Sequence, residues 1–391
     1  MSEHQAVGLS VQVYAPAFGT AYTPKNGTLG KFDFSGYDHT LTSGVGFDTM
    51  GTSRACSVEE AYWWLGNACG AHVEVQDETA VVVWEGRVDT VSVSTGGFSI
   101  QRGPLSETAN RCVVTYQLMD PGTGLAAWAA EGQEQKRTLA ANHTVAQAKY
   151  GIQTAILSAG LVTTDRANNI RDTYAILNSW PRVPKQLSLG GGDTTVSLAC
   201  KGYYHWLNYP YRLANTTAIA NLSDKIVTVL AADPNHFFDM PNQIATNTLW
   251  VPALEDQDRS ASEIISDMVA LGDAAYNRYT FGVWQNREAR YGITPTIIEY
   301  QQRADDKRQA VEDMGDNEVR PWAVLPDKWI TFTNVLPGSL SAQVGIYQGQ
   351  EQERAMFIES VKYSSPAGLT LQGGQVNTLK QRLAQWGLTG I

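Results

Sequence analysis

The densest group of side chains that could do chemistry is the acidic stretch containing Glu255, Asp256 and Asp258. Carboxylates of this kind can bind calcium, and two of them at a suitable separation can act as the acid and the base of a glycosidase. The stretch lacks the glycine and the closing glutamate of a calcium-binding loop. We therefore expect a solvated loop that leads into a helix beginning after Ser260.

Cys69 and His72 have the spacing of two zinc ligands, but a structural zinc site needs four, and no matching pair lies nearby in the sequence. The chain contains no nucleophile elbow, no His-Glu-x-x-His and no phosphate-binding loop. Gly190–Gly192 precedes an expected strand and so does not join a strand to a helix. The sequence predicts no catalytic residue, no metal site and no cofactor. The four cysteines are expected as free, mostly buried thiols, because they are too few for a disulfide framework; they are Cys56, Cys69, Cys112 and Cys200.

Five aromatic residues crowd into the nine positions from 203 to 211; they are Tyr203, Tyr204, Trp206, Tyr209 and Tyr211. Such a group can form a platform on which sugar rings stack. It can equally be a strand and turn that pack aromatic rings into a core or a subunit contact, which aromatic side chains dominate in both settings. We favour the packing role for this group.

One strand-turn-strand sequence motif occurs twice, over residues 89–103 and 359–374. With Pro366 left out, fifteen positions pair, and five pairs are identical: Val91/Val361, Ser94/Ser364, Gly97/Gly368, Gln101/Gln372 and Gly103/Gly374. Both copies alternate polar and apolar residues around a glycine-containing turn, which is the pattern of a half-buried hairpin. We interpret the two copies as equivalent hairpins of two related domains.

A second pattern also recurs in both halves. Ser57–Glu60 and Ser260–Glu263 each have the form of a capping box that opens a helix. Each predicted helix ends at Leu-Gly, and a strand carrying a tryptophan (Trp84 or Trp284) follows it. The recurrence of this order of elements supports a duplication independently of the repeated hairpin motif.

The expected fold is mainly β with α, with two tandem, related β-barrel-like domains. The first domain spans residues 1–125 and includes one helix. A helical connector spans 126–190, with an amphipathic helix over 145–159 closed by Gly160 and a second helix over 169–180. The second barrel spans 191–375 with an insertion around 286–350, and residues 376–391 form a terminal helix.

Bulk composition narrows the function further. The 391 residues carry 29 Lys or Arg against 39 Asp or Glu, a net charge of −10. The sequence lacks the cluster of basic residues that a nucleic-acid-binding surface requires. The N-terminal residues have neither the basic nor the apolar segment of a signal peptide. The longest apolar run, from Ala155 to Val162, is too short to cross a bilayer. We expect a soluble protein made in a cytoplasm, without membrane insertion.

Five short segments of the sequence together resemble the tail hub proteins of tailed bacteriophages, which are also called baseplate hub or minor tail proteins. The resemblance covers most of residues 30–385 and is carried by short structural motifs: residues 81–88, 196–204, 271–287, 321–329 and 358–369. The resemblance implies two related β-barrels in one chain. Three chains would then present six barrels in a ring that adapts a sixfold tail tube to a threefold tip.

The resemblance also implies partners and a location. The partners would be two further copies of the chain, the tail tube and distal tail proteins, the tail tip or fibre proteins, and the tape-measure protein. DNA would pass through the lumen without specific binding, which an acidic lining favours. The location would be the virion tail tip. Two other functions stay open from the residues alone: a virion adhesin that binds carbohydrate through the aromatics of 203–211, and a cell-wall glycosidase.

Overall fold

The computed structural model describes residues 8–119, 136–187, 191–211, 220–239, 241–251, 259–275, 277–293, 297–302, 309–312, 318–333, 355–365 and 368–374. The described helices are α1 (Val58–Asn67), α2 (Thr144–Tyr150), α3 (Thr164–Asn178), α4 (Leu222–Ala231) and α5 (Ala261–Leu271). Short 3-10 turns are η1 (Leu105–Glu107), η2 (Tyr203–Trp206), η3 (Gln285–Arg287) and η4 (Pro321–Ala323). Strands dominate the described chain, so the expected class, mainly β with α, is confirmed.

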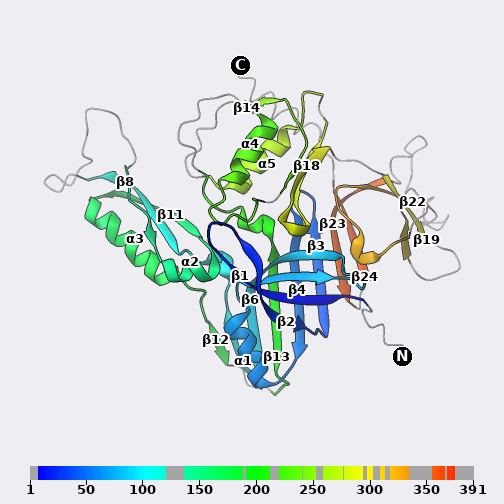
Figure 1. Ribbon diagram of the computed structural model, residues 1–391, viewed down its shortest axis with the longest axis horizontal. Coiled ribbons are helices and arrows are strands. Elements are labelled where there is room, and N and C mark those ends of the chain that lie inside the picture. The colour runs from blue at the N-terminus through cyan, green and yellow to red at the C-terminus, as the bar shows by residue number, and fades with distance from the viewer. Residues whose placement is uncertain are drawn as a thin grey trace, which may run out of the picture.

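Most described strands belong to one eighteen-stranded sheet. Its first half contains β1 (Ser10–Ala17), β2 (Thr23–Phe32), β3 (Gly36–Thr42), β4 (Gly46–Ala55), β5 (His72–Gln76), β6 (Val82–Thr95), β7 (Phe98–Arg102), β12 (Lys185–Leu187) and β13 (Thr195–Gly202). Its second half contains β15 (Gln243–Ile244), β17 (Tyr279–Val283), β18 (Ala289–Ile293), β19 (Ile297–Gln302), β20 (Gln309–Glu312), β21 (Glu318–Val319), β22 (Trp329–Thr333), β23 (Ala355–Ser365) and β24 (Gly368–Gly374). The two halves are joined side by side where β23 pairs with β3 (Figure 1).

The repeated sequence motif folds as a β-hairpin in both copies. The first copy is β6–β7 and the second is β23–β24, and both are antiparallel pairs. The matched residues Val91 and Val361 are both fully buried, because the period-2 alternation turns the same set of positions inward in each hairpin. The prediction of two hairpins is confirmed.

The two hairpins differ in register by two residues. In β6–β7, Val91 lies opposite Arg102, whereas the matched Val361 lies opposite Leu371, which corresponds to Ile100. A two-residue loop, Gly96-Gly97, closes the first hairpin, and the turn of the second lies outside the described residues. Because a shift of two preserves the alternation, both hairpins bury the same face despite their different registers.

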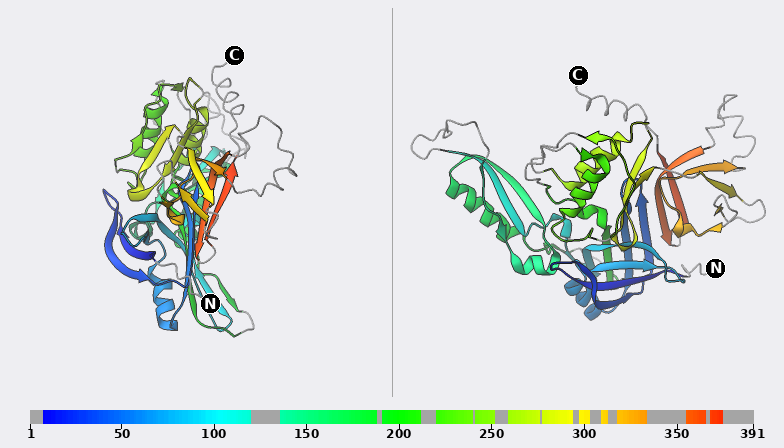
Figure 2. Two further views of the ribbon diagram at one scale, coloured as in Figure 1. Left: turned by 90° about the vertical axis from the view of Figure 1, so that its right-hand side faces the viewer. Right: turned by 45° about the horizontal axis from the view of Figure 1, so that its top comes forward.

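Neither half closes into a barrel among the described strands, which corrects the expectation of barrel-like domains. Closure requires the first and last strands of a sheet to pair. Within the described residues, β2 pairs only with β1, and β24 pairs only with β23. The strands instead form one open, curved sheet that serves both halves (Figure 2).

A separate arm projects from the sheet at the left of Figure 1. It contains β8 (Arg111–Leu118), β9 (Lys136–Arg137), β10 (Ala141–Asn142), α2, β11 (Thr154–Val162) and α3. Strand β8 pairs in parallel with β11, and α3 covers this pair through a small core that includes Val114, Tyr116 and Ala167. The helix expected over 169–180 is confirmed as part of α3.

The helix expected over 145–159 is wrong beyond residue 150. Helix α2 ends at Gly151, whose φ of +78° favours glycine. The apolar residues that follow form β11 because their backbone groups pair with β8, and this pairing overrides the helical spacing. Gly160 does not cap a helix but lies in an irregularity of the β11 register between Ser158 and Leu161.

Helices α4 and α5 pack together above the sheet, with β14 (Ala220–Asn221) paired to β16 (Trp250–Val251) beside them (Figure 1). Ser260 and Glu263 form a full capping box at α5, as predicted. At α1, the Ser57 side chain accepts from the Glu60 amide. Both predicted helix starts are therefore confirmed. No helix among the described residues is long and apolar enough to cross a membrane.

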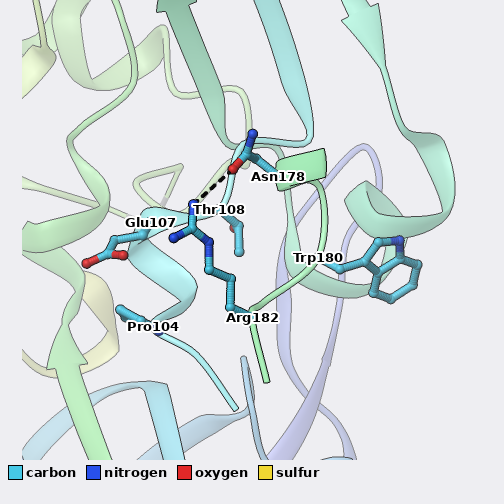
Figure 3. Close-up of a pocket in the computed structure, with 6 residues that line it drawn as sticks. All are labelled: Pro104, Glu107, Thr108, Asn178, Trp180 and Arg182. Atoms are coloured by element: carbon cyan, nitrogen blue, oxygen red, sulfur yellow. Dashed lines mark hydrogen bonds between the residues drawn. The ribbon is translucent and has the colours of Figure 1, made fainter. Parts of the chain in front are cut away.

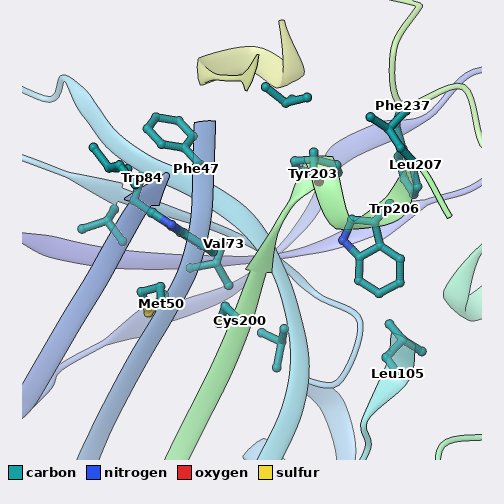
Figure 4. Close-up of a cluster of buried hydrophobic side chains, with 14 of the residues drawn as sticks. Phe47, Met50, Val73, Trp84, Leu105, Cys200, Tyr203, Trp206, Leu207 and Phe237 are labelled. Atoms are coloured by element: carbon teal, nitrogen blue, oxygen red, sulfur yellow. The ribbon is translucent and has the colours of Figure 1, made fainter. Parts of the chain in front are cut away.

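One large core unites the sheet, α1, α4 and α5. Figure 4 shows its centre, where Trp84, Phe47 and Met50 lie on one side and Tyr203 and Trp206 on the other. The strand β13 runs between them and pairs with β4 on one edge and β6 on the other. Gly202 ends this strand, and a Cβ there would lie 1.7 Å from the Phe47 carbonyl oxygen. Only glycine permits this close approach of backbones.

Candidate functional site: a buried charged junction

Seven polar side chains meet inside the molecule where β5, β6, η2 and η3 come together with the loop between β1 and β2. We name this group the junction cluster; it consists of Tyr22, His72, Glu74, Glu85, Arg87, Tyr203 and Arg287, and none of its members is more than 7% exposed. Buried charges at this density are rare unless they are paired or hydrogen-bonded. The partners of these groups therefore decide what the cluster does.

A chain of hydrogen bonds runs through one half of the junction cluster. The Tyr22 hydroxyl lies 2.7 Å from the Tyr203 hydroxyl, which lies 2.8 Å from His72 Nδ1. His72 Nε2 lies 3.3 Å from Glu74 Oε1, and Lys25 Nζ pairs with the same oxygen at 2.6 Å. Burial lowers the pKa of His72. Burial alone would raise the pKa of Glu74, but hydrogen bonds from His72 and Lys25 lower it to about 2.

Arg87 is the centre of the other half. It donates from Nη2 to the Gly70 carbonyl at 3.2 Å and to the Tyr150 carbonyl at 3.0 Å. Its guanidinium lies over the Trp206 ring at 4.5 Å and over the Phe237 ring at 5.3 Å. Arginine binds carbonyls and stacks on aromatic faces at the same time, so it suits this position. One side chain thereby links β6, the end of α2 in the arm, η2 and the loop after α4.

Glu85 and Arg287 lie beside each other in the interior, and they form a loose ion pair when Glu85 is ionised. Arg287 Nη1 lies 3.8 Å from Glu85 Oε1, and the Asn286 amide donates to Glu85 Oε2 at 2.5 Å. Asn286 and Arg287 both have φ near +60°, a costly conformation for residues with a side chain. The contacts with Glu85 and with the Phe237 carbonyl, 3.1 Å from Arg287 Nε, hold this strained turn in place. Burial raises the pKa of Glu85 to about 7, against the opposing effect of Arg287.

The raised pKa of Glu85 predicts a loss of stability as pH increases. The folded protein holds the Glu85 proton up to about pH 7, whereas the unfolded chain releases it near its ordinary pKa of 4.5. The stabilising contribution of the Glu85 proton to the free energy of unfolding is fully present below pH 4.5. It amounts to about 3 kcal/mol and is lost as pH rises from 4.5 through 7. Glu85→Gln has no proton to lose. The difference in unfolding free energy between this variant and the wild type should therefore increase over this pH range.

Urea unfolding at several pH values measures this effect, and the exposed Glu59→Gln serves as the matched control. The lowered pKa of His72 gives a stability change of opposite sign below pH 6.5, but it is present in wild type and variant and cancels in their difference. Parallel pH profiles for wild type and Glu85→Gln would contradict the assignment of Glu85 as a buried, proton-holding group.

The junction cluster is suited to holding elements together rather than to catalysis. His72 lies beside an acid and a hydroxyl, as a general base would. However, His72, Glu74 and Tyr203 are each no more than 3% exposed, which leaves no surface for a substrate. The sequence did not single out Glu85, Arg87 or Arg287. The only signal for Glu85 and Arg87 was that they interrupt an otherwise apolar strand, and Arg287, in the turn η3, gave no such signal.

Cys69 and His72, which have the spacing of two zinc ligands, do not form a metal site with each other. The Cys69 thiol donates to the Asp89 carbonyl at 3.8 Å, and both ring nitrogens of His72 already have partners, Tyr203 and Glu74. Within the described ranges, no group of three or more His, Cys, Asp or Glu side chains is placed to hold a metal ion. Glu255, Asp256 and Asp258 lie outside the described residues. All four cysteines are free thiols, and three of them are buried, as expected.

The aromatic run belongs to the core. Tyr203, Trp206, Tyr209 and Tyr211 are buried, and Tyr204 is half-buried. The Tyr209 hydroxyl donates to the Val229 carbonyl at 2.6 Å, which ties the run to α4. The packing interpretation is confirmed, and these rings do not form a sugar-binding platform at the surface.

Comparisons with known proteins give a likeness in architecture only. No protein-family model matches the chain, and no curated protein matches it. Among solved structures, a tail protein from Neisseria meningitidis MC58 has a TM-score of 0.44 and 8% identity, covering 96% of this chain and 98% of that one. The 43 kDa tail protein of prophage MuSo2 from Shewanella oneidensis has a TM-score of 0.44 and 6% identity, with the same coverage. Likeness at this level assigns neither a family nor a function to this chain.

A shallow hollow lies where the arm meets the sheet. It is lined by Pro104, Glu107, Thr108, Asn178, Trp180 and Arg182, with Arg182 Nη2 donating to Asn178 Oδ1 at 3.3 Å (Figure 3). The hollow has room for about one water molecule. It is too small to bind an organic substrate, but it marks an exposed seam between arm and sheet.

Proposed function

We propose that this chain is a non-enzymatic structural protein of a phage virion, the tail hub that joins the tail tube to the tail tip. The observation that carries the proposal is the repeated hairpin. The copies β6–β7 and β23–β24 bury the same face and lie in one continuous sheet. A chain with two equivalent elements can occupy two equivalent positions in a ring.

The arrangement of the proposed ring follows from this repeat. Three copies with two related β-domains each would give six positions around a tail axis, which matches a sixfold tube to a threefold tip. The outer edges of β2 and β24 carry no partner strand among the described residues, and unpaired edges invite pairing with another chain. Pairing between chains would complete the barrels that the single chain leaves open.

The proposed partners are two further copies of the chain, tail tube and distal tail proteins, tip or fibre proteins, and the tape-measure protein. The proposed location is the virion tail tip, with DNA passing through the lumen. A net charge of −10 supports an acidic lining that does not hold phosphates. The buried junction cluster supports a structural role, because its charged groups contact and join neighbouring strands, turns and loops. The adhesin alternative loses its supporting observation, since four of its five aromatics are buried.

Imaging of intact virions that carry this chain tests the proposal. We expect three copies around the tail axis, each with two β-domains in one layer of six positions. Six copies with one β-domain each in that layer would refute the proposed arrangement. A position away from the axis would overturn the hub function itself and favour a peripheral attachment protein.

A further inference from the structure

An exposed apolar segment follows the body of α3. Residues 176–187, which we name the docking segment, run from the last turn of α3 to the end of β12, along the seam shown in Figure 3. Five of its large apolar side chains are exposed: Ile176, Leu177, Trp180, Val183 and Leu187. Leu177 is 71% exposed and Leu187 is 78% exposed. Several large apolar side chains exposed along one short segment can mark an interaction site.

The docking segment is also basic. Residues 136–187 carry seven Lys or Arg against two Asp, a net charge of +5 in a chain whose total is −10. Arg182 and Lys185 lie exposed among the apolar side chains of the segment. Strand β12 pairs with β7 along one edge only, within the described residues. The surface thus combines apolar anchors, cations and a strand edge, and its partner must be apolar and acidic.

A complementary surface lies on the same chain around α4. Among the described residues of 222–271, four acidic side chains are exposed, and Arg259 and the buried Lys225 are the basic residues; the four are Asp224, Asp239, Glu263 and Asp267. Asp224 and Asp267 are exposed, whereas Lys225 is buried. Val227 on the outer face of α4 is 50% exposed. Trp250 is 67% exposed, and its backbone pairs with that of Asn221, the residue before α4, so Trp250 lies next to the start of the helix whose first turn contains Asp224.

We propose that the docking segment of one copy binds the α4 surface of a second copy, with Leu177 and Trp180 packed against Val227 and Trp250. Two docking segments would repel each other if they met, because both are basic, so the contact is head-to-tail. Contacts of this type close into rings when their rotation fits. In that respect the inference rests on the proposed ring and names a second contact between neighbouring chains, beside the pairing of the β2 and β24 edges. Trp and Arg are the residue types that carry most interface energy.

Disulfide trapping between full-length chains tests the contact directly. All chains carry Cys56→Ser to remove the half-exposed thiol, and one chain also carries Leu177→Cys while the other carries Val227→Cys. Docking brings the two thiols together, so the mixture should form a linked heterodimer at least about tenfold faster than the control mixture of Leu177→Cys with Ile293→Cys. Residue 293 is as exposed as Val227 but lies outside the α4 surface.

Charge reversal then tests the chemistry of the contact. Adding Arg182→Asp and Lys185→Asp to the Leu177→Cys chain should slow linkage about tenfold. Pairing that chain with one that carries Val227→Cys and Asp224→Lys should restore much of the rate, which misfolding of the first chain would not allow. Linkage no faster than in the control mixture overturns the proposal, as does a dominant Leu177→Cys homodimer.

The two proposals fail separately. A trimeric ring in virions without linkage between positions 177 and 227 leaves the hub function standing and rejects this contact. Linkage that responds to the charge reversals, in a chain that lies off the tail axis, rejects the hub function and retains the contact.

Discussion

Replacing Arg87 by Met is expected to lower the free energy of unfolding by about 3–5 kcal/mol, among the largest effects of any single substitution in this chain. The variant loses the hydrogen bonds to the Gly70 and Tyr150 carbonyls and leaves both acceptors buried without this donor. It also loses the stacking of the guanidinium on the Trp206 ring. Urea or thermal unfolding of the purified chain measures the change.

Arg290→Met is the matched control. Arg290 has a side chain that is 45% exposed and pairs with Glu288 at the surface, where an ion pair contributes about 0–1 kcal/mol. Arg87→Lys is a second variant, which keeps the charge but cannot reach both carbonyls with one planar group, and should show an intermediate loss. Equal stabilities for Arg87→Met and Arg290→Met would show that the junction cluster does not hold the elements together.

Trp84→Ala is expected to cost about 3–5 kcal/mol, through lost apolar burial and the cavity that the indole leaves. Trp84 is fully buried near the start of β6, and its ring lies against Gly86, where even a methyl group would approach it to 2.4 Å. Its indole nitrogen has no hydrogen-bond partner, so the loss is one of packing alone. Denaturant midpoints report the effect.

Trp63→Ala provides the comparison, because Trp63 lies on the outer face of α1 and is 44% exposed. Its removal should cost no more than about 1 kcal/mol, since surface substitutions away from special features have small effects. Trp84→Leu retains part of the apolar volume and should fall between the two, which keeps the comparison informative if Trp84→Ala does not fold. A Trp63→Ala loss as large as that of Trp84→Ala would contradict the assigned burial.

Local patterns of the sequence determined the hairpins and the helix starts. The alternation in residues 89–103 and 359–374 predicted both hairpins, because a strand with one buried face must repeat every two residues. Ser57 and Ser260 predicted the starts of α1 and α5, because a cap depends only on residues within the first turn. These features need no information from distant parts of the chain.

The tertiary structure alone decided the strand β11, the open sheet and the junction cluster. Residues 145–159 satisfy a helical spacing, and pairing with β8 makes those from 154 on a strand. The Tyr22–Tyr203 and Glu85–Asn286 contacts join residues that are 181 and 201 positions apart. No short-range pattern encodes such contacts, because they depend on where the whole sheet brings each strand. The charged residues of β5 and β6 lie buried at the centre of the molecule because η2, η3 and the β1–β2 loop pack over them.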